Sequence, residues 1–211
     1  MIADSPYTGA YPWLERRRGV WREIARYVRR DATEVGTLVE LGPGYCDFIN
    51  QFPASHKIGF DLNPEMSTFA ASDVELRIAS AVELAGIEPG GVDLVFASNF
   101  LEHLNTDELE ILLPGIRRVL SPRGRLILIQ PNYRRCASHY FDDPTHRTVF
   151  HDGNIGDWLT RHRLRPLRIV PGLLPFSMKS RLPKWPILTR LYLHSPIRPL
   201  AAQMYVVAEP A

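Results

Sequence analysis

The amino-acid sequence predicts a doubly wound α/β fold, in which helices cover both faces of a mostly parallel sheet. Short β-rich runs alternate with helix-like stretches from residue 37 to residue 162. Strand candidates such as Leu126–Ile129 are apolar throughout, as a sheet covered on both faces requires. The chain has 211 residues, 45% apolar and 23% charged, which fits one domain with a sizeable core. We therefore expect residues 1–211 to form a single domain.

A leading helix is predicted over residues 11–30, where Trp21, Ile24 and Val28 lie at helical spacing. Further helices are predicted at Cys46–Phe52, Pro64–Ala70, Asn99–His103, Asp107–Leu120 and Gly153–His162. The alternating strands are expected at Thr37–Leu41, Lys57–Phe60, Glu75–Ala79, Val92–Ser98 and Arg125–Gln130.

The order of the elements changes after Arg163. A β-like run at Leu167–Val170 is followed by a Pro-rich, basic stretch over residues 171–199 and by a last strand at Gln203–Ala208. Two strands separated by a long connection, at the end of the chain, predict an antiparallel pair that closes one edge of the sheet.

Composition restricts the class of protein. Cys46 and Cys136 are too few for a disulfide framework or a zinc cluster, and they suit a reducing compartment. We see neither a signal peptide nor a run of about 20 apolar residues that could span a bilayer. The expected localisation is cytoplasmic.

A glycine-containing turn follows the first predicted strand. Gly42 and Gly44 come directly after Leu41, where the backbone must turn sharply and a ligand can approach it closely. A dinucleotide fingerprint would have a third glycine where Asp47 stands, and a negative side chain there opposes a pyrophosphate. The turn therefore favours a nucleoside ligand that carries no phosphate.

Two acidic residues at strand ends indicate which ligand that is. Glu40 stands just before the turn, where a carboxylate suits an ammonium group. Asp61 ends the second strand, in position to accept hydrogen bonds from both hydroxyls of a ribose. An adenosine with a cationic tail satisfies both carboxylates.

Four motifs in order carry a family resemblance: Glu40-Leu-Gly-Pro-Gly44, Asp61, the segment from Val92 to Leu104 and the segment from Gly124 to Asn132. With them the chain resembles the class I S-adenosylmethionine-dependent methyltransferases, over about residues 11–150. The resemblance implies a Rossmann-like sheet of seven mostly parallel strands with an antiparallel C-terminal edge pair. It also implies a methyltransferase with S-adenosylmethionine as its cofactor.

The resemblance assigns regions and residues. Residues 37–132 would form the cofactor-binding core, 133–163 an acceptor-side loop and helix, and 164–211 the closing strands. The implied cofactor contacts are Glu40, Gly42, Pro43 and Gly44 for the methionine part, Asp61 and Leu62 for ribose and adenine, Ser80 and Ala81 for the adenine edge, and Ser98 and Asn99 for the rim near the methyl group. Many relatives have an acid near Ser80, where this chain has only Glu83.

Methyl transfer to an oxygen or nitrogen is an in-line displacement, in which positioning supplies much of the rate and the protein adds at most a base. Asn99, Glu102 and His103 follow the fourth strand on one helical face, and His146 lies in a loop that resembles the one closing over the acceptor. We predict His103 and His146 as the catalytic residues, with a loop-pinning role for His146 as the alternative. Some relatives bind a divalent metal here with Glu in place of Asn99, so we predict no metal.

The C-terminal part of the chain carries the basic surplus. Residues 158–208 contain nine Lys or Arg and no Asp or Glu, and residues 171–199 add Trp185 and many leucines. Such a segment suits an anionic membrane surface. A lid over a soluble anionic substrate and an oligomer contact remain alternatives. Nucleic acid is not expected as a partner, because the basic run is short and lacks an RNA-binding module.

The predicted function is therefore methylation, expected at oxygen, of a small-molecule, saccharide or lipid-linked acceptor. A catalytically silent cofactor-binding scaffold and an NAD-dependent oxidoreductase are the alternatives, and Asp47 disfavours the latter.

Overall fold

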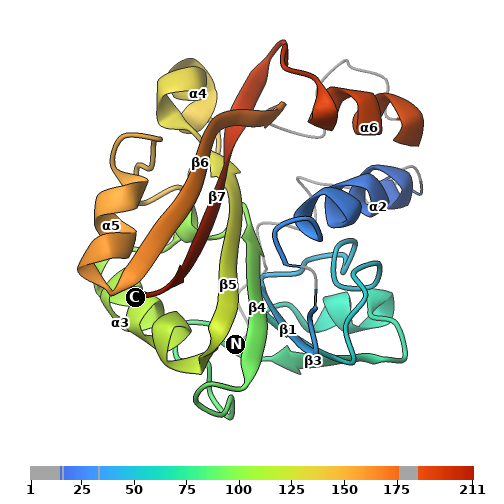
Figure 1. The fold of residues 1–211 in the computed structure, drawn as a ribbon, viewed down its shortest axis with the longest axis vertical. Helices are drawn as coiled ribbons and strands as arrows, with labels where there is room; N and C mark the ends of the chain where they lie inside the picture. Colours follow the sequence, from blue (N-terminus) through green and yellow to red (C-terminus); the bar gives the residue numbers. More distant parts are fainter. Residues whose placement is uncertain (1–14, 16, 33, 176–184) are drawn as a thin grey trace.

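The structure, a computed structural model, describes residues 15, 17–32, 34–175 and 185–211. One seven-stranded sheet runs through it in the order β3-β2-β1-β4-β5-β7-β6 (Figure 1). The strands are β1 (Thr37–Leu41), β2 (His56–Asp61), β3 (Val74–Ile78), β4 (Val92–Ser98), β5 (Leu120–Pro131), β6 (Leu164–Pro175) and β7 (Ala201–Pro210). Strands β1 to β5 are paired in parallel, and β7 is antiparallel to both β5 and β6. The predicted fold class is confirmed.

Helices cover both faces of the sheet, because successive side chains of the central strands point to opposite sides. On one face, α3 (Thr106–Val119) and α5 (Ile155–Arg161) pack against residues such as Val95 and Leu126. On the other face, α2 (Arg17–Val28) packs on Leu94 and Ile127. Figure 1 shows α3 and α5 on one side of the sheet and α2 on the other.

The predicted helix at Cys46–Phe52 is wrong. Cys46 has a φ of 54°, a left-handed conformation that an α-helix does not include. The segment consists of turns, closed by hydrogen bonds such as Phe52 N to Phe48 O (3.0 Å). The helices expected at Pro64–Ala70 and Asn99–His103 are shorter 3₁₀ helices, η1 (Pro64–Phe69) and η2 (Leu101–His103).

Two helices were not predicted. The first, α4 (Tyr133–Tyr140), begins after Asn132, whose side chain accepts a hydrogen bond from the backbone N–H of Arg134. The second, α6 (Pro186–His194), lies within the basic stretch 171–199 and packs on α2. Its proline stands at the first helical position, where proline is favoured.

The stretch 171–199 is also less irregular than expected at its start, because β6 continues to Pro175. Residues 176–184 of this stretch, and residues 11–14 and 16 of the predicted leading helix, lie outside the described residues. Within the described ranges, no helix has the length and hydropathy needed to cross a bilayer.

Candidate active site

A cleft of about 2730 Å³ opens at the carboxyl ends of β1, β2 and β4. Ligands of doubly wound sheets bind at this edge, where loops rather than strands meet the solvent. The cleft is lined by all twelve residues that the sequence predicts for the site: Glu40, Gly42, Pro43, Gly44, Asp61, Leu62, Ser80, Ala81, Ser98, Asn99, His103 and His146. The structure thus brings together residues that span more than half of the chain.

The turn after β1 needs its glycines for two different reasons. Gly42 and Gly44 have φ values of 63° and 52°, which favour glycine. A Cβ atom on Gly42 would also lie 2.7 Å from the Phe100 ring, whereas one on Gly44 would meet nothing within 4 Å. The backbone at Gly44 is therefore open to a ligand.

Glu40 is a buried carboxylate at this turn, with a relative exposure of 3%. Its Oε2 atom is buried and has no hydrogen-bond partner in the described part of the chain. Burial raises the pKa of Glu40 well above its ordinary value, and the nearby charges of Asp47 and Asp61 add to this effect. A cationic group bound beside Glu40 would stabilise its ionised form.

Asp47, which the sequence marks as unsuited to a pyrophosphate, is paired in the structure. Arg17 of α2 donates from Nε to Asp47 Oδ2 at 2.7 Å, and its guanidinium lies over the Tyr45 ring. Arg17 also lines the cleft, which the sequence did not predict. The Arg17 guanidinium therefore lies beside the carboxylates of this turn.

Asp61 is held in a defined orientation by the backbone. Its Oδ2 accepts from Gly44 N at 3.0 Å and its Oδ1 from Asn63 N at 2.9 Å. Leu62, the next residue, is 73% exposed. A carboxylate beside an exposed apolar side chain suits a nucleoside, whose sugar is polar and whose base is flat and largely apolar.

The adenine-side prediction lies farther along the same cleft. Ser80 Oγ accepts a hydrogen bond from Val82 N at 3.2 Å, and Ala81 is buried. Glu83 is exposed and does not line the cleft as the described residues form it. Glu83 therefore does not take the place of the acid that many relatives have near Ser80.

Asn99 forms the rim in a left-handed backbone conformation, with φ of 49°. Asparagine tolerates this conformation better than most side chains. Gln203 of β7 donates from Nε2 to Asn99 Oδ1 at 2.6 Å and also lines the cleft. No local sequence signal pairs these residues, because 104 positions separate them.

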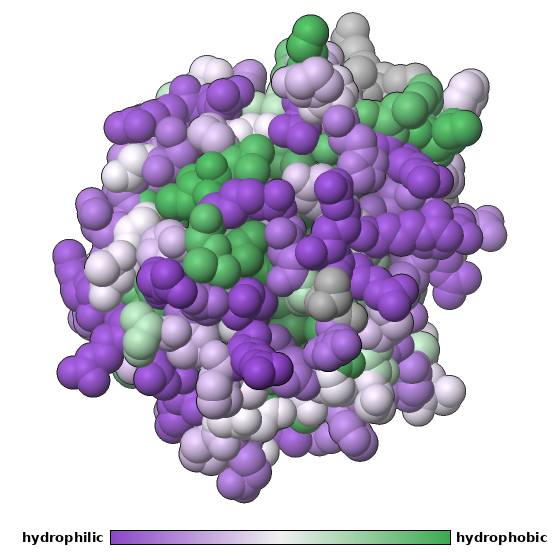
Figure 2. Space-filling view, viewed as in Figure 1, coloured by the Kyte–Doolittle hydropathy of each residue, from purple (hydrophilic) through white to green (hydrophobic). Residues whose placement is uncertain are grey.

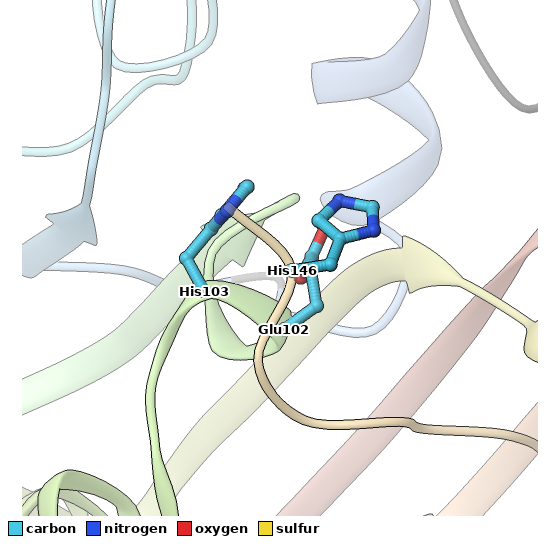
Figure 3. Close-up of side chains that lie close together, drawn as sticks. All are labelled: Glu102, His103 and His146. Atoms are coloured by element: carbon cyan, nitrogen blue, oxygen red, sulfur yellow. The ribbon is translucent and has the colours of Figure 1, made fainter. Parts of the chain in front are cut away.

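Glu102, His103 and His146 form one cluster that lines the cleft. Each offers a ligand atom, and these atoms lie within 4.8 Å of one another. Figure 3 shows Glu102 and His103 on η2 and His146 on the loop after α4. The two imidazole ring centroids are 5.0 Å apart.

The cluster is deeply desolvated. Glu102 is 0% exposed, and neither carboxylate oxygen has a hydrogen-bond partner among the described residues. Burial, with a contribution from the charge of Asp143, raises the pKa of Glu102 to about 8. Burial lowers the pKa of both histidines, so neutral imidazoles are available at pH 7. These three side chains are also a donor set that could hold a divalent cation, and the absence of a metal stays a prediction.

The structure has a doubly wound α/β fold with a cleft at the carboxyl ends of its strands, and comparisons with known proteins show which proteins share this fold. Residues 39–128 match the methyltransferase domain family. The chain is 30% identical over 142 residues to an uncharacterised 37.1 kDa protein in transposon TN4556 of Streptomyces fradiae. That alignment covers 61% of this chain, and the chain spans 41% of the length of that curated relative.

Solved structures share the fold across nearly the whole chain. A SAM-dependent methyltransferase from Archaeoglobus fulgidus has a TM-score of 0.67 and 18% identity, covering 92% of this chain and 94% of its own. Geranyl diphosphate C-methyltransferase from Streptomyces coelicolor, solved with Mg²⁺, geranyl diphosphate and S-adenosylhomocysteine, has a TM-score of 0.65 and 15% identity, covering 89% and 80%. A putative methyltransferase bound to the Trm112 activator of Haloferax volcanii has a TM-score of 0.68 and 16% identity, covering 92% and 93%. Residues 39–128 therefore match a methyltransferase domain, and the chain has the fold that these S-adenosylmethionine-dependent methyltransferases share.

Proposed function

We propose that this chain is an enzyme that transfers the methyl group of S-adenosylmethionine to a nucleophile on an apolar or lipid-linked acceptor. The observation that carries the proposal is one crevice formed by buried Glu40, the open backbone at Gly44 and oriented Asp61. The crevice offers a carboxylate to a cationic amino-acid end and a second carboxylate to a ribose. When bound, the cofactor supplies a methyl group already activated by its positive sulfur.

Each part of the crevice has a role in this proposal. Glu40 would hold the ammonium group of the methionine part, which would lie along the open backbone at Gly44. Asp61 would accept from the ribose hydroxyls, with Leu62 covering the base. Ser98 ends β4 and Asn99 follows it at the rim, near the cluster of Glu102, His103 and His146. Cofactor and acceptor would therefore meet between the turn after β1 and that cluster.

The protein's part in the chemistry is to orient the acceptor, exclude water and take up one proton. A neutral histidine can accept the proton of an acceptor hydroxyl as the oxygen attacks, which is general-base catalysis. His103 and His146 are the neutral groups that line the acceptor side of the cleft. O-methylation suits this arrangement, because a hydroxyl is a weak nucleophile until its proton is removed.

The nature of the acceptor is suggested by α6 and the residues after it. Leu188, Leu191, Ile197 and Leu200 line the cleft and are 37%, 63%, 78% and 73% exposed. Trp185 and Ile187 extend this apolar surface outside the cleft, at 65% and 67% exposed. Figure 2 shows hydrophobic side chains at the upper right, over the region where Figure 1 draws α6.

The occupant that fits this surface is a bilayer with anionic lipids. Arg190 and Arg198 stand among the apolar residues, and residues 158–208 contain no acidic side chain. Apolar side chains would enter the interface while the cations contact headgroups, each adding about 1 kcal/mol. A lipid-linked acceptor could then reach the cleft along α6.

The experiment that tests the activity is calorimetry with S-adenosylhomocysteine and, separately, NAD. We expect micromolar binding of S-adenosylhomocysteine and none of NAD, followed by label transfer from methyl-labelled S-adenosylmethionine into a lipid extract. Binding of S-adenosylhomocysteine without transfer to any extract would favour the silent scaffold. Binding of NAD alone would reject the methyltransferase.

Leu191→Asp tests the membrane surface. Burying a leucine side chain contributes about 1.5–3 kcal/mol, so the variant should bind phosphatidylcholine–phosphatidylglycerol vesicles at least tenfold more weakly at low salt. Ile111→Asp is the matched control, because Ile111 is 53% exposed on α3, on the other face of the sheet. Co-sedimentation measures both. If the unmodified chain does not bind these vesicles at low salt, the membrane surface is rejected.

A further inference from the structure

Three side chains of the acceptor-side loop and η2 form a hydrogen-bonded chain that the sequence did not predict. Thr145 donates its backbone N–H to Asp143 Oδ1 at 2.9 Å and its hydroxyl proton to the same oxygen at 2.5 Å. The Thr145 hydroxyl oxygen also lies 2.8 Å from Nδ1 of His103. Asp143, Thr145 and His103 are all partly buried, and Thr145 and His103 both line the cleft.

The direction of this chain follows from counting protons. A threonine hydroxyl has one proton to donate, whereas an ionised carboxylate can only accept. Hydrogen bonds from Thr145 keep the pKa of Asp143 below its ordinary value despite its burial, so Asp143 is ionised at pH 7. The hydroxyl proton therefore goes to Asp143. The remaining contact requires Nδ1 of His103 to be the donor, because the hydroxyl oxygen can only accept there.

We propose that Asp143 and Thr145 hold His103 as its Nδ1–H tautomer, so that Nε2 takes up the proton of the acceptor during methyl transfer. Asp143 and Thr145 are then positioning residues that act through His103. The proposal rests on the proposed function and adds to it a choice between the two predicted catalytic histidines. A hydrogen bond at one ring nitrogen determines which tautomer is present and thus which nitrogen carries the basic lone pair.

His146 lacks a chain of this kind, although a hydrogen bond with the Tyr140 backbone raises its pKa. Its Nδ1 atom is buried and has no hydrogen-bond partner in the described ranges, and its ring packs on Tyr140. The ionisable groups that face His103 are Asp143, His146 and Glu102. Burial lowers the pKa of His103 most and the charge of His146 lowers it further, whereas the charge of Asp143 and hydrogen bonds with the Thr145 and Asn99 backbones raise it. The geometry therefore assigns the oriented base to His103 and a neighbouring role to His146.

The step balances without another reactant. The acceptor's O–H proton moves to the Nε2 lone pair as the oxygen forms its bond to the methyl carbon. The carbon–sulfur bond breaks, and its electrons go to the sulfur, which leaves S-adenosylhomocysteine neutral at that atom. His103 then carries the proton as an imidazolium, which Asp143 stabilises through the Thr145 hydroxyl. Solvent takes the proton before the next turnover.

The test reads the tautomer of His103 directly. Two-bond ¹H–¹⁵N spectra of the ¹⁵N-histidine-labelled protein with S-adenosylhomocysteine distinguish Nδ1–H from Nε2–H, and His103→Asn assigns the signal. We expect Nδ1–H in the unmodified protein and in Thr145→Ser, which keeps the hydroxyl. Thr145→Val keeps the side-chain shape but removes the hydroxyl, so it should lose the preference and show a lower pKa of His103 in an NMR titration.

Kinetics with the acceptor from the labelled-donor screen give a second readout. General-base catalysis contributes about 10²–10⁴-fold, so kcat of Thr145→Val should fall at least tenfold with an unchanged dissociation constant for S-adenosylhomocysteine. Thr145→Ser should recover most of kcat. An Nε2–H tautomer in the unmodified protein would overturn the proposal, as would an unchanged kcat in Thr145→Val. Failure of the proposed function would give a different result. The protein would then not bind S-adenosylhomocysteine, and the tautomer of His103 could still be measured in the protein alone.

Discussion

Replacing Asp61 by Ala should weaken the binding of S-adenosylhomocysteine about 100-fold. The carboxylate would accept two hydrogen bonds from the ribose, and hydrogen bonds to charged groups contribute about 1.5–3 kcal/mol each. A loss of about 3 kcal/mol corresponds to roughly 100-fold in the dissociation constant. The substitution also removes the acceptor of Gly44 N–H, which lies 3.0 Å from Asp61 Oδ2 and helps to hold the turn open to the ligand. Calorimetry at pH 7 measures the dissociation constant.

Two variants control for this result. Asp61→Asn keeps one acceptor oxygen and should fall between the unmodified protein and Asp61→Ala. Glu34→Ala removes an exposed acid just before the amino end of β1, at the opposite edge of the sheet, and should leave affinity unchanged. Near-normal affinity of a folded Asp61→Ala protein would remove Asp61 from the cofactor site and with it the main support for the nucleoside assignment.

Replacing Glu102 by Gln should change how the stability of the fold depends on pH. Burial raises the pKa of Glu102 to about 8 in the folded protein from an ordinary value of 4.5. The folded state therefore holds a proton that the unfolded chain releases above about pH 4.5. The stability that this proton contributes is fully present below pH 4.5 and is lost as pH rises to about 8, at up to about 1.4 kcal/mol per pH unit.

The measurement is urea denaturation of both proteins at several pH values between 5 and 8.5. Glu102→Gln has no ionisable group at this position. Its unfolding free energy should therefore increase relative to that of the unmodified protein as pH rises, and the difference should become constant above about pH 8. Glu88→Gln, in the loop before β4, is the control because Glu88 is exposed, and its stability profile should follow that of the unmodified protein. Parallel pH profiles for Glu102→Gln and the unmodified protein would contradict the buried, unpaired state of Glu102.

The residues of the proposed cofactor crevice could be predicted from the sequence because they lie in short local segments. Glu40, Gly42 and Gly44 lie in one strand and turn, and Asp61 ends the next strand of a parallel sheet. Parallel strands place their carboxyl ends at one edge, so the sequence order of these residues also predicts that they lie close together. The structure places all four in one cleft.

Two predictions about helices were wrong, because the backbone conformation of one residue or the position of a proline determined whether a helix forms. Cys46 adopts a positive φ because the turn must continue past Gly44, and no periodicity of apolar residues reveals this. The sequence does not predict α6, because the stretch that contains it is rich in proline. Pro186 nevertheless stands at the first helical position, where a helix accepts proline. Its amphipathic pattern is short, and packing on α2 stabilises it.

By itself, the sequence determined the fold class, the residues of the proposed cofactor crevice and the candidate pair His103 and His146, because strand ends, turns and motif spacing are encoded by neighbouring residues. Only the tertiary structure decided that Glu102 is buried beside both histidines, that Thr145 joins Asp143 to His103, and that Gln203 supports Asn99. These relations join segments 42 to 104 positions apart. The packing of a loop and of strand β7 against the sheet edge creates them, and local sequence patterns do not encode such packing.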